Sequence, residues 1–211
     1  LESKKRELIV DKWYWGILDE IQIDNYMVQR ALIQFALGEL YRGGQSGEVN
    51  YEKAFEWYSK AAEQGFALAQ YVLGNLYYFE CGLKVDYERA KEWWQKSAEQ
   101  GLDIAQYALG NFYYFGKGVE IDYEKAHAWY QKSAELGNID AQYALGKAYY
   151  YGEGVEVDYR KAFEWYSKAA ERERGDERAQ YALGKAYYYG KGVEVDYEKA
   201  FEWYSKAAEQ D

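Results

Sequence analysis

The sequence has 211 residues, of which 49% are hydrophobic and 20% aromatic, and it contains no proline. This apolar content allows a substantial core and argues against a disordered chain, and the absence of proline is typical of a helix-rich protein. The formal net charge of −10 and the pI near 4.8 disfavour nucleic acid and anionic membranes as main partners, because both attract clustered lysine and arginine side chains.

Residues 1–32 have no counterpart elsewhere in the chain. Apolar and aromatic residues recur there at helical spacing, namely Val10, Trp13 or Tyr14, Ile17 and Ile21. Asp24 or Asn25 could cap the helix that follows. We therefore expect an N-terminal capping helix, although the aromatic stretch from Trp13 to Trp15 could instead mark a ligand site. Apolar runs here and downstream are too short to span a bilayer, and we expect no cleavable signal peptide.

From residue 33 onward the sequence repeats itself five times. Glycines in register mark the repeats at steps of 36, 36, 36 and 38 residues: Gly38, Gly74, Gly110, Gly146 and Gly184. The stretch YEKAFEWYSKAAEQ is identical at 51–64 and 197–210, as expected where each repeat has the same neighbours. We predict that the segment 1–32 is followed by five tandem repeats: 33–68, 69–104, 105–140, 141–178 and 179–211.

Each repeat is predicted to form two helices. In the fourth repeat, one apolar stripe marks the first helix and another marks the second: Ala141, Ala144, Leu145, Ala148 and Tyr149, then Ala162, Trp165, Tyr166 and Ala169. Asp158 is the predicted N-cap of the second helix, and other repeats have the equivalent caps Asn50, Asp86, Asp122 and Asp196. Gly152 and Gly154 are predicted to take positive φ angles between the helices. The second helices are predicted to end at glycine caps, at Gly65, Gly101 and Gly137.

The fourth repeat, AQYALGKAYYYGEGVEVDYRKAFEWYSKAAE, resembles the sel-1-like repeat, a relative of the tetratricopeptide repeat with a longer loop between its helices. The resemblance covers residues 33–211, with five copies in register. It implies an all-α fold, a right-handed α-solenoid of five helix-turn-helix repeats, which the capping helix expected in residues 1–32 would precede. It also implies an adaptor for protein partners, with a concave surface lined mainly by the first helices.

A second stripe runs along each first helix and, unlike the packing stripe, changes from repeat to repeat. One position reads Leu32, Leu68, Ile104, Asp140 and Arg178, and another reads Glu39, Asn75, Asn111, Lys147 and Lys185. A groove that reads a non-repeating ligand would show such variation, as would unselected drift on a solvated surface. We predict that this concave face binds a protein or an extended peptide through Phe35, Glu39, Tyr71, Asn75, Tyr78, Phe79, Tyr107, Asn111, Tyr114, Phe115, Tyr143, Lys147, Tyr150, Tyr151, Tyr181, Lys185 and Tyr188.

Several residue types on this face suit a peptide ligand. Asn75 and Asn111 resemble the groove asparagines of tetratricopeptide clamps, since an amide can both donate a hydrogen bond to a peptide backbone and accept one from it. Lys147 and Lys185 could attract acidic groups of the ligand, and the aromatic rings would supply flat contact area. The alternative for any individual ring, which we favour, is that it packs between repeats.

No residue pattern indicates catalysis, a metal or a cofactor. His127 is the only histidine, and its equivalents in three other repeats are phenylalanines. Because it lacks a nucleophile or a second metal ligand at a suitable spacing, we interpret it as an ordinary helix residue. Cys81 stands alone, so no disulfide within the chain is expected, and it is predicted to lie in an exposed loop.

The leading hypothesis is therefore a protein–protein interaction scaffold that is not an enzyme. The alternative is an engineered or recently duplicated structural scaffold without a dedicated ligand, which self-associates through its ends, for example as a homodimer. The fourth and fifth repeats, compared over 141–171 and 179–209, differ at only two of 31 positions, as design or recent duplication would produce. A third alternative is an enzyme or glycan binder that stacks its ligand on tyrosine and tryptophan rings, but no group of residues in the sequence supports it.

Overall fold

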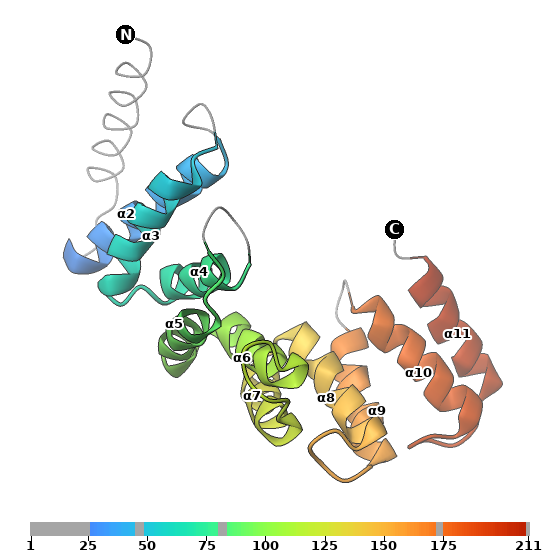
Figure 1. The fold of residues 1–211 in the computed structure, drawn as a ribbon. Coiled ribbons are helices and arrows are strands. Elements are labelled where there is room, and N and C mark those ends of the chain that lie inside the picture. The colour runs from blue at the N-terminus through green and yellow to red at the C-terminus, as the bar shows by residue number, and fades with distance from the viewer. Residues whose placement is uncertain (1–25, 45–48, 80–83, 172–174, 210–211) are drawn as a thin grey trace. The chain divides into compact units, whose positions relative to one another are not determined.

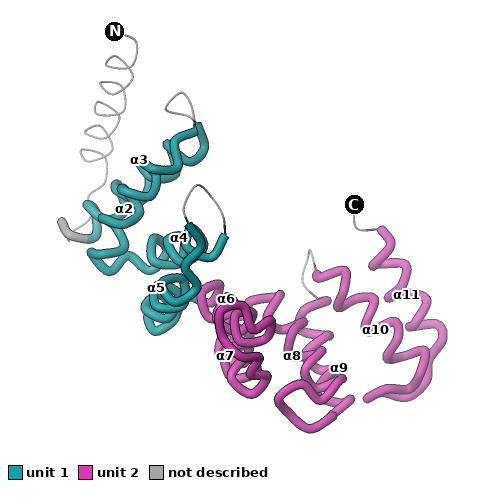
Figure 2. Tube along the Cα trace, in the orientation of Figure 1, with its two compact units in different colours: residues 1–102 teal, residues 103–211 magenta. Residues whose placement is uncertain are grey.

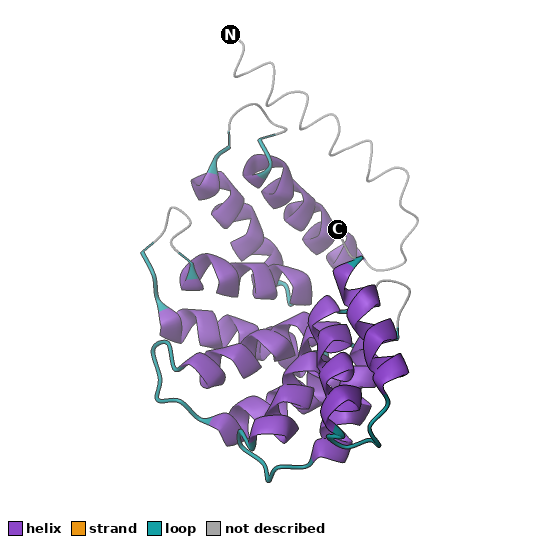
Figure 3. Cartoon of the chain, turned by 90° about the vertical axis from the view of Figure 1, so that its right-hand side faces the viewer, coloured by secondary structure: helices purple, strands orange, loops and turns teal. Residues whose placement is uncertain are grey.

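The computed structural model describes residues 26–44, 49–79, 84–171 and 175–209, and within these residues the only regular elements are helices (Figures 1 and 3). The helices are α2 (Tyr26–Arg42), α3 (Tyr51–Glu63), α4 (Ala67–Tyr78), α5 (Tyr87–Glu99), α6 (Asp103–Phe115), α7 (Tyr123–Glu135), α8 (Ile139–Tyr151), α9 (Tyr159–Ala170), α10 (Glu177–Tyr189) and α11 (Tyr197–Ala208). The predicted all-α class is confirmed. The predicted capping helix and the two candidate caps that follow it lie outside the described residues.

The chain divides into two compact units, 1–102 and 103–211 (Figure 2). The first unit contains α2 to α5 and the second contains α6 to α11. In both units the helices pack as consecutive pairs, each pair being the first and second helix of one repeat. Within the described residues, no helix combines the length and the apolar character that crossing a membrane requires.

The second helix of each repeat begins at the predicted N-cap. Asp158 accepts hydrogen bonds from the backbone amides of Arg160 and Lys161 at 3.1 and 3.0 Å, which satisfies amide groups that have no partner inside the helix. Equivalent bonds are made in the other repeats by Asn50, Asp86, Asp122 and Asp196. The polar residue before each second helix therefore fixes where that helix starts.

Glycines end the helices and shape the loops as predicted. Gly65, Gly101 and Gly137, which follow second helices, have φ angles of 88°, 87° and 92°. In the loop of the fourth repeat, Gly152 and Gly154 have φ angles of 76° and 74°. Gly154 has a further constraint, because a Cβ atom there would overlap the backbone carbonyl of Tyr123 in the preceding repeat.

The in-register glycines of the first helices make room for an aromatic ring of the second helix. A Cβ atom on Gly146 would overlap the ring of Tyr166, which is 5% exposed. A Cβ atom on any of the other in-register glycines would overlap the equivalent ring, in the pairs Gly38–Tyr58, Gly74–Trp94, Gly110–Tyr130 and Gly184–Tyr204. These glycines therefore allow the two helices of each repeat to pack closely together.

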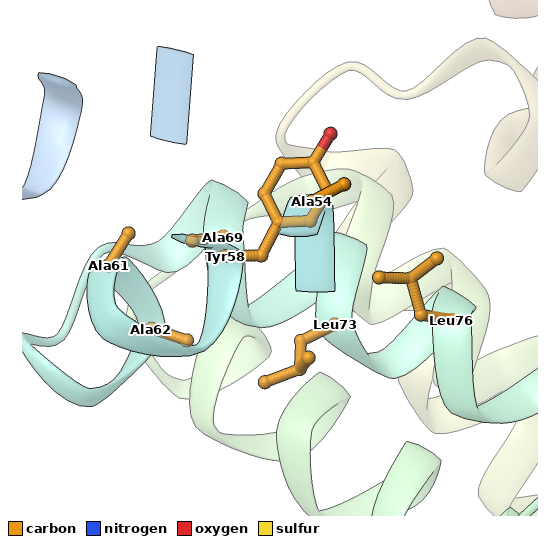
Figure 4. Close-up of a cluster of buried hydrophobic side chains, with 7 residues drawn as sticks. All are labelled: Ala54, Tyr58, Ala61, Ala62, Ala69, Leu73 and Leu76. Carbon is orange, nitrogen blue, oxygen red and sulfur yellow. The ribbon is translucent and has the colours of Figure 1, made fainter. Parts of the chain in front are cut away.

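The core lies between the two helices of a repeat and the next first helix. In the first unit, α3 and α4 meet through small and aliphatic side chains around one buried tyrosine (Figure 4), in a cluster of Ala54, Tyr58, Ala61, Ala62, Ala69, Leu73 and Leu76. In the fourth repeat, Leu145 and Tyr166 are buried as predicted, whereas Trp165 and Tyr149 are only partly buried.

One buried polar position recurs that the apolar stripes did not reveal. It is a glutamine in each first helix, only 5–6% exposed: Gln34, Gln70, Gln106, Gln142 and Gln180. Gln70 Nε2 donates to the carbonyl of Ala62 at 3.1 Å, and Gln142 Nε2 donates to the carbonyl of Ala134 at 3.2 Å. Each of these bonds links a first helix to the end of the second helix of the preceding repeat.

Candidate functional site

The first cavity of the second unit has a volume of about 160 Å³ and lies mainly among α6, α7 and α8. Predicted site residues supply part of its wall: Tyr107, Asn111, Tyr114, Phe115, Tyr143 and Lys147. The other lining residues are Tyr123, Ala126, His127, Tyr130, Asp140, Ala144, Ala148, Glu153 and Arg178. The predicted face of the third and fourth repeats is thus brought together around one hollow.

The second cavity has a volume of about 140 Å³ and lies among α8, α9 and α10. It is lined by Tyr143, Lys147, Tyr150, Tyr151, Tyr166, Arg178, Tyr181, Ala182 and Lys185. Since Tyr143, Lys147 and Arg178 line both cavities, the two hollows adjoin.

The remaining predicted site residues lie elsewhere. Tyr188 is exposed on α10 and lines neither cavity. The members from the first two repeats belong to the first unit and also line neither cavity: Phe35, Glu39, Tyr71, Asn75, Tyr78 and Phe79. These two cavities therefore gather members of the predicted face from the third, fourth and fifth repeats.

The predicted rings make ring-to-ring contacts with the second helix of their own repeat, and Tyr114 and Tyr143 also contact charged side chains of the next first helix. The ring centroids of Tyr143 and Tyr166 are 5.8 Å apart, and those of Tyr150 and Tyr159 are 5.2 Å apart. Ring contacts between repeats involve the preceding tyrosine, which is Tyr149 in the fourth repeat and Tyr187 in the fifth. Tyr187 packs on Phe163 of the fourth repeat, with ring centroids 5.4 Å apart. The same rings thus stabilise each hairpin and line the cavities.

The variable position that begins with Glu39 accepts a hydrogen bond from the second helix of its own repeat in the first three repeats. We call it the variable position of the first helices from here on. The Tyr58 hydroxyl donates to Glu39 Oε1 at 2.6 Å. Trp94 Nε1 donates to Asn75 Oδ1 at 3.1 Å, and the Tyr130 hydroxyl donates to Asn111 Oδ1 at 2.8 Å. The amide oxygens of the predicted asparagine clamp therefore each already accept one hydrogen bond within their own repeat.

In the fourth repeat the variable position is Lys147, and it faces the third repeat. Its Nζ atom lies 3.4 Å from the Tyr114 hydroxyl, which in turn donates to Glu153 Oε1 at 3.0 Å. Burial on its own lowers the pKa of Lys147, but the Tyr114 hydrogen bond and the nearby Glu153 outweigh it and raise that pKa. The side chain is therefore a partly buried ammonium group at the boundary of the two cavities.

Arg178 is the centre of an ion-pair cluster that the predicted site did not include. Its Nη2 atom lies 2.5 Å from Asp140 Oδ1 and 2.5 Å from Asp176 Oδ2, and its guanidinium carbon is 4.6 Å from the centre of the Tyr143 ring. The two carboxylates raise the pKa of Arg178 further above its ordinary value. The sequence signal for Arg178 was the series that begins with Leu32. Its aliphatic members are followed by Asp140 in one repeat and Arg178 in the next.

His127 lines the first cavity, but its contacts are those of a packing residue. Its ring meets Tyr149 edge to face with centroids 5.3 Å apart, as Phe55 meets Tyr77 and Phe163 meets Tyr187. Burial, with a smaller effect of the Lys161 charge, lowers its pKa. Within the described residues, no three histidine, cysteine or acidic side chains are placed to hold a metal ion. Cys81 lies outside these residues.

Comparison with known structures places this arrangement among repeat proteins. A protective antigen of uropathogenic Escherichia coli with the SLR fold is 33% identical, with a TM-score of 0.83; the match covers 99% of this chain and 46% of the antigen, so the chain spans less than half of that protein. A Sel1 repeat protein of Oxalobacter formigenes is 32% identical, with a TM-score of 0.81 and coverage of 100% and 85%. A Klebsiella pneumoniae protein described as a sel1 repeat protein, 24% identical with a TM-score of 0.51 and coverage of 84% and 86%, shares the fold.

Comparison of sequences identifies the repeats themselves. No curated protein matches the chain significantly. The model of the Sel1 repeat matches five consecutive segments, at 32–66, 67–102, 103–138, 139–173 and 177–211. These matches cover nearly all of the described helices, and the solenoid of helical hairpins is shared with the Oxalobacter protein. The chain therefore belongs to the Sel1 repeat family.

Proposed function

We propose that the chain binds an extended segment of a protein partner along the first-helix face of its second unit and performs no catalysis itself. Sel1 repeat proteins are generally scaffolds for protein–protein interaction. The observation that carries the proposal for this chain is the pair of adjoining cavities, which share Tyr143, Lys147 and Arg178. Two hollows with a common wall suit a ligand that continues from one to the next, as an extended peptide does at about 3.3 Å per residue.

The chemistry of the lining supports a peptide ligand. Tyrosine rings present a large contact area and lose little rotamer entropy on binding, and their hydroxyls can bond to a peptide backbone. Tyr151 and Tyr181 are both exposed at the second cavity, so their contact area is accessible before any ligand binds. The mixture of aromatic and charged groups is also that of a typical interface, where tyrosine and arginine are enriched.

The competing proposal is self-association through the end of the array. Sedimentation over a wide concentration range tests it. A chain that stays monomeric at high concentration would contradict self-association and would leave segment binding as the remaining proposal.

Segment binding is best tested with two matched tyrosine variants, one at the second cavity and one away from it. Tyr151 lines the second cavity, is 59% exposed and packs edge to face on Tyr150 at 4.8 Å. Tyr189 is its equivalent in the fifth repeat, is 60% exposed, packs on Tyr188 at 4.8 Å and lines neither cavity. Tyr151→Ala and Tyr189→Ala should therefore change stability to a similar extent.

The measurement is binding of a peptide array to the full chain, followed by affinities for the strongest peptides. We expect Tyr151→Ala to weaken binding about tenfold, as for one well-placed interface aromatic, and Tyr189→Ala to leave it unchanged. Equal affinities in the two variants would refute a site at the second cavity. Alanine variants of Asn75 and Asn111 are less suitable probes, because they would also remove the acceptors used by Trp94 and Tyr130.

A further inference from the structure

The variable position of the first helices changes its hydrogen-bonding character between the third and fourth repeats. Its first three members, Glu39, Asn75 and Asn111, each accept a hydrogen bond from the aromatic residue of the second helix. In the fourth repeat the position is Lys147, an ammonium group that can only donate. The aromatic residue opposite it is Tyr166, whose hydroxyl is also a donor.

Lys147 thus offers no acceptor to the Tyr166 hydroxyl. Within the described residues this hydroxyl forms no hydrogen bond, whereas Tyr130, its equivalent, bonds to Asn111 at 2.8 Å. Tyr166 is only 5% exposed, and it lines the second cavity. Burial raises the pKa of Tyr166 above its ordinary value, so the hydroxyl stays protonated at neutral pH. The hydroxyl oxygen is not among the buried polar atoms without a partner, so it is open to the cavity and can donate to water or to a ligand there.

The charges of the second cavity complement this donor. Its lining contains Lys147, Arg178 and Lys185 but no carboxylate, in a chain whose net charge is −10. Arg178 is already paired with Asp140 and Asp176. Within the described part of the chain, neither Lys147 nor Lys185 forms an ion pair. The cavity therefore offers two ammonium groups and a hydroxyl, each of which can donate a hydrogen bond.

We propose that the second cavity binds a carboxylate side chain of the partner segment, which accepts hydrogen bonds from the Tyr166 hydroxyl and the ammonium group of Lys147, with Lys185 contributing charge. This inference rests on the proposed segment binding and assigns a chemical class to one residue of the ligand, glutamate or aspartate. Charge-assisted bonds from a partly buried ammonium are stronger than neutral ones, so they give selectivity against the isosteric amides. The acidic surface elsewhere repels such a ligand at long range, so the selectivity is local.

The test uses the full chain and synthetic peptides about ten residues long, in a background of tyrosine, leucine and serine, long enough to run through both cavities. One glutamate is moved along the peptide, and each peptide is compared with its glutamine counterpart by fluorescence anisotropy. We expect the best glutamate peptide to bind about tenfold more tightly than its counterpart. Lys147→Asn and Tyr166→Phe should each reduce this ratio to near one. Lys168→Asn removes the same charge on α9 at a residue that lines neither cavity, and should leave the ratio unchanged.

A stability readout tests the missing acceptor without any ligand. Tyr130→Phe removes a formed hydrogen bond, so it should lower the urea midpoint, whereas Tyr166→Phe should leave the midpoint nearly unchanged. In the Lys147→Asn background, which recreates the arrangement at Asn111, Tyr166→Phe should lower the midpoint as Tyr130→Phe does. Equal losses for both phenylalanine variants in the native background would overturn the argument from the unpaired hydroxyl.

The two proposals fail in different ways. Equal binding of glutamate and glutamine peptides, both weakened by Tyr151→Ala, would refute the carboxylate site and support segment binding. A glutamate preference that Lys168→Asn reduces as strongly as Lys147→Asn would also refute the site, since it would reflect net charge alone. Peptide binding that Tyr151→Ala and Tyr189→Ala affect equally would refute segment binding at this cavity.

Discussion

Replacing Gly146 with alanine tests the close contact between the two helices of a repeat. In an isolated helix this change is favourable, because glycine in a helix interior costs about 1 kcal/mol relative to alanine. In this protein the added Cβ atom would overlap the ring of Tyr166, at a contact shorter than side chains make. The sign of the change in stability therefore decides whether propensity or packing dominates at this position.

The structure indicates that packing dominates. Tyr166 is 5% exposed and lies in a core cluster with Ala169, Ala179 and Leu183, so its ring has little room to move. Overpacking a core of this kind costs about 1–3 kcal/mol, beyond any accompanying gain in helix propensity. We expect Gly146→Ala to lower the free energy of unfolding by about 1–3 kcal/mol, which corresponds to roughly 2–4 °C per kcal/mol for a chain of this size.

Urea denaturation followed by circular dichroism measures this change, and two further variants locate its cause. Gly184→Ala places the same Cβ atom against Tyr204, which is only half-buried on α11 and can move, so it should cost less. Tyr166→Leu removes the ring, so adding Gly146→Ala in that background should cost little, giving a positive coupling in a double-mutant cycle. A Gly146→Ala protein about 1 kcal/mol more stable than the native chain, or an equal cost in both backgrounds, would refute the reasoning.

Two other predictions concern pH and helix capping. Burial lowers the pKa of His127 in the fold, whereas its unfolded value is about 6.5, so the unfolded chain binds more protons in the interval between these values. Stability should therefore be lost as the pH falls below about 6.5, and His127→Phe, which copies Phe55 and Phe163, should remove that loss; a pH profile of urea midpoints that is identical for both proteins would contradict it. Asp158→Ala should lower the free energy of unfolding by about 1 kcal/mol, because the backbone amides of Arg160 and Lys161 lose their acceptor. Asp158→Asn retains an acceptor oxygen and serves as the control, so an equal loss in the two variants would show that the cap is not the cause.

The features that could be predicted from the sequence depend on interactions between residues close together in the chain. An N-cap such as Asp158 bonds to amides two and three residues ahead, and a glycine such as Gly152 is required by its own φ angle. Both are visible in a short stretch of sequence; the N-cap recurs in all five repeats, and the glycine recurs in four, with Glu80 at its position in the second repeat. The helix boundaries of the second helices therefore followed directly from the printed sequence.

The parts of the site that could not be predicted depend on contacts across the hairpin. Asn111 and Tyr130 are 19 residues apart, and only the packed helices show that the hydroxyl donates to the amide oxygen. The prediction treated Tyr166 as a core residue alone, because its spacing matches the packing stripe, and so missed its hydroxyl at the cavity. The buried glutamines were missed for a different reason, since a search for apolar stripes ignores polar side chains; their constant spacing was the available signal.

Those glutamines have a consequence for how neighbouring hairpins melt. The carbonyl of Ala134 accepts from the Gly137 amide at 3.0 Å within its own repeat and from Gln142 Nε2 at 3.2 Å across the boundary to the next. When α8 detaches, the second bond is lost, at a net cost of about 1 kcal/mol, together with the apolar contact around it. Adjacent hairpins are thus thermodynamically coupled like neighbours in a one-dimensional chain, and within each unit amide hydrogen exchange should show them opening as contiguous blocks rather than one at a time.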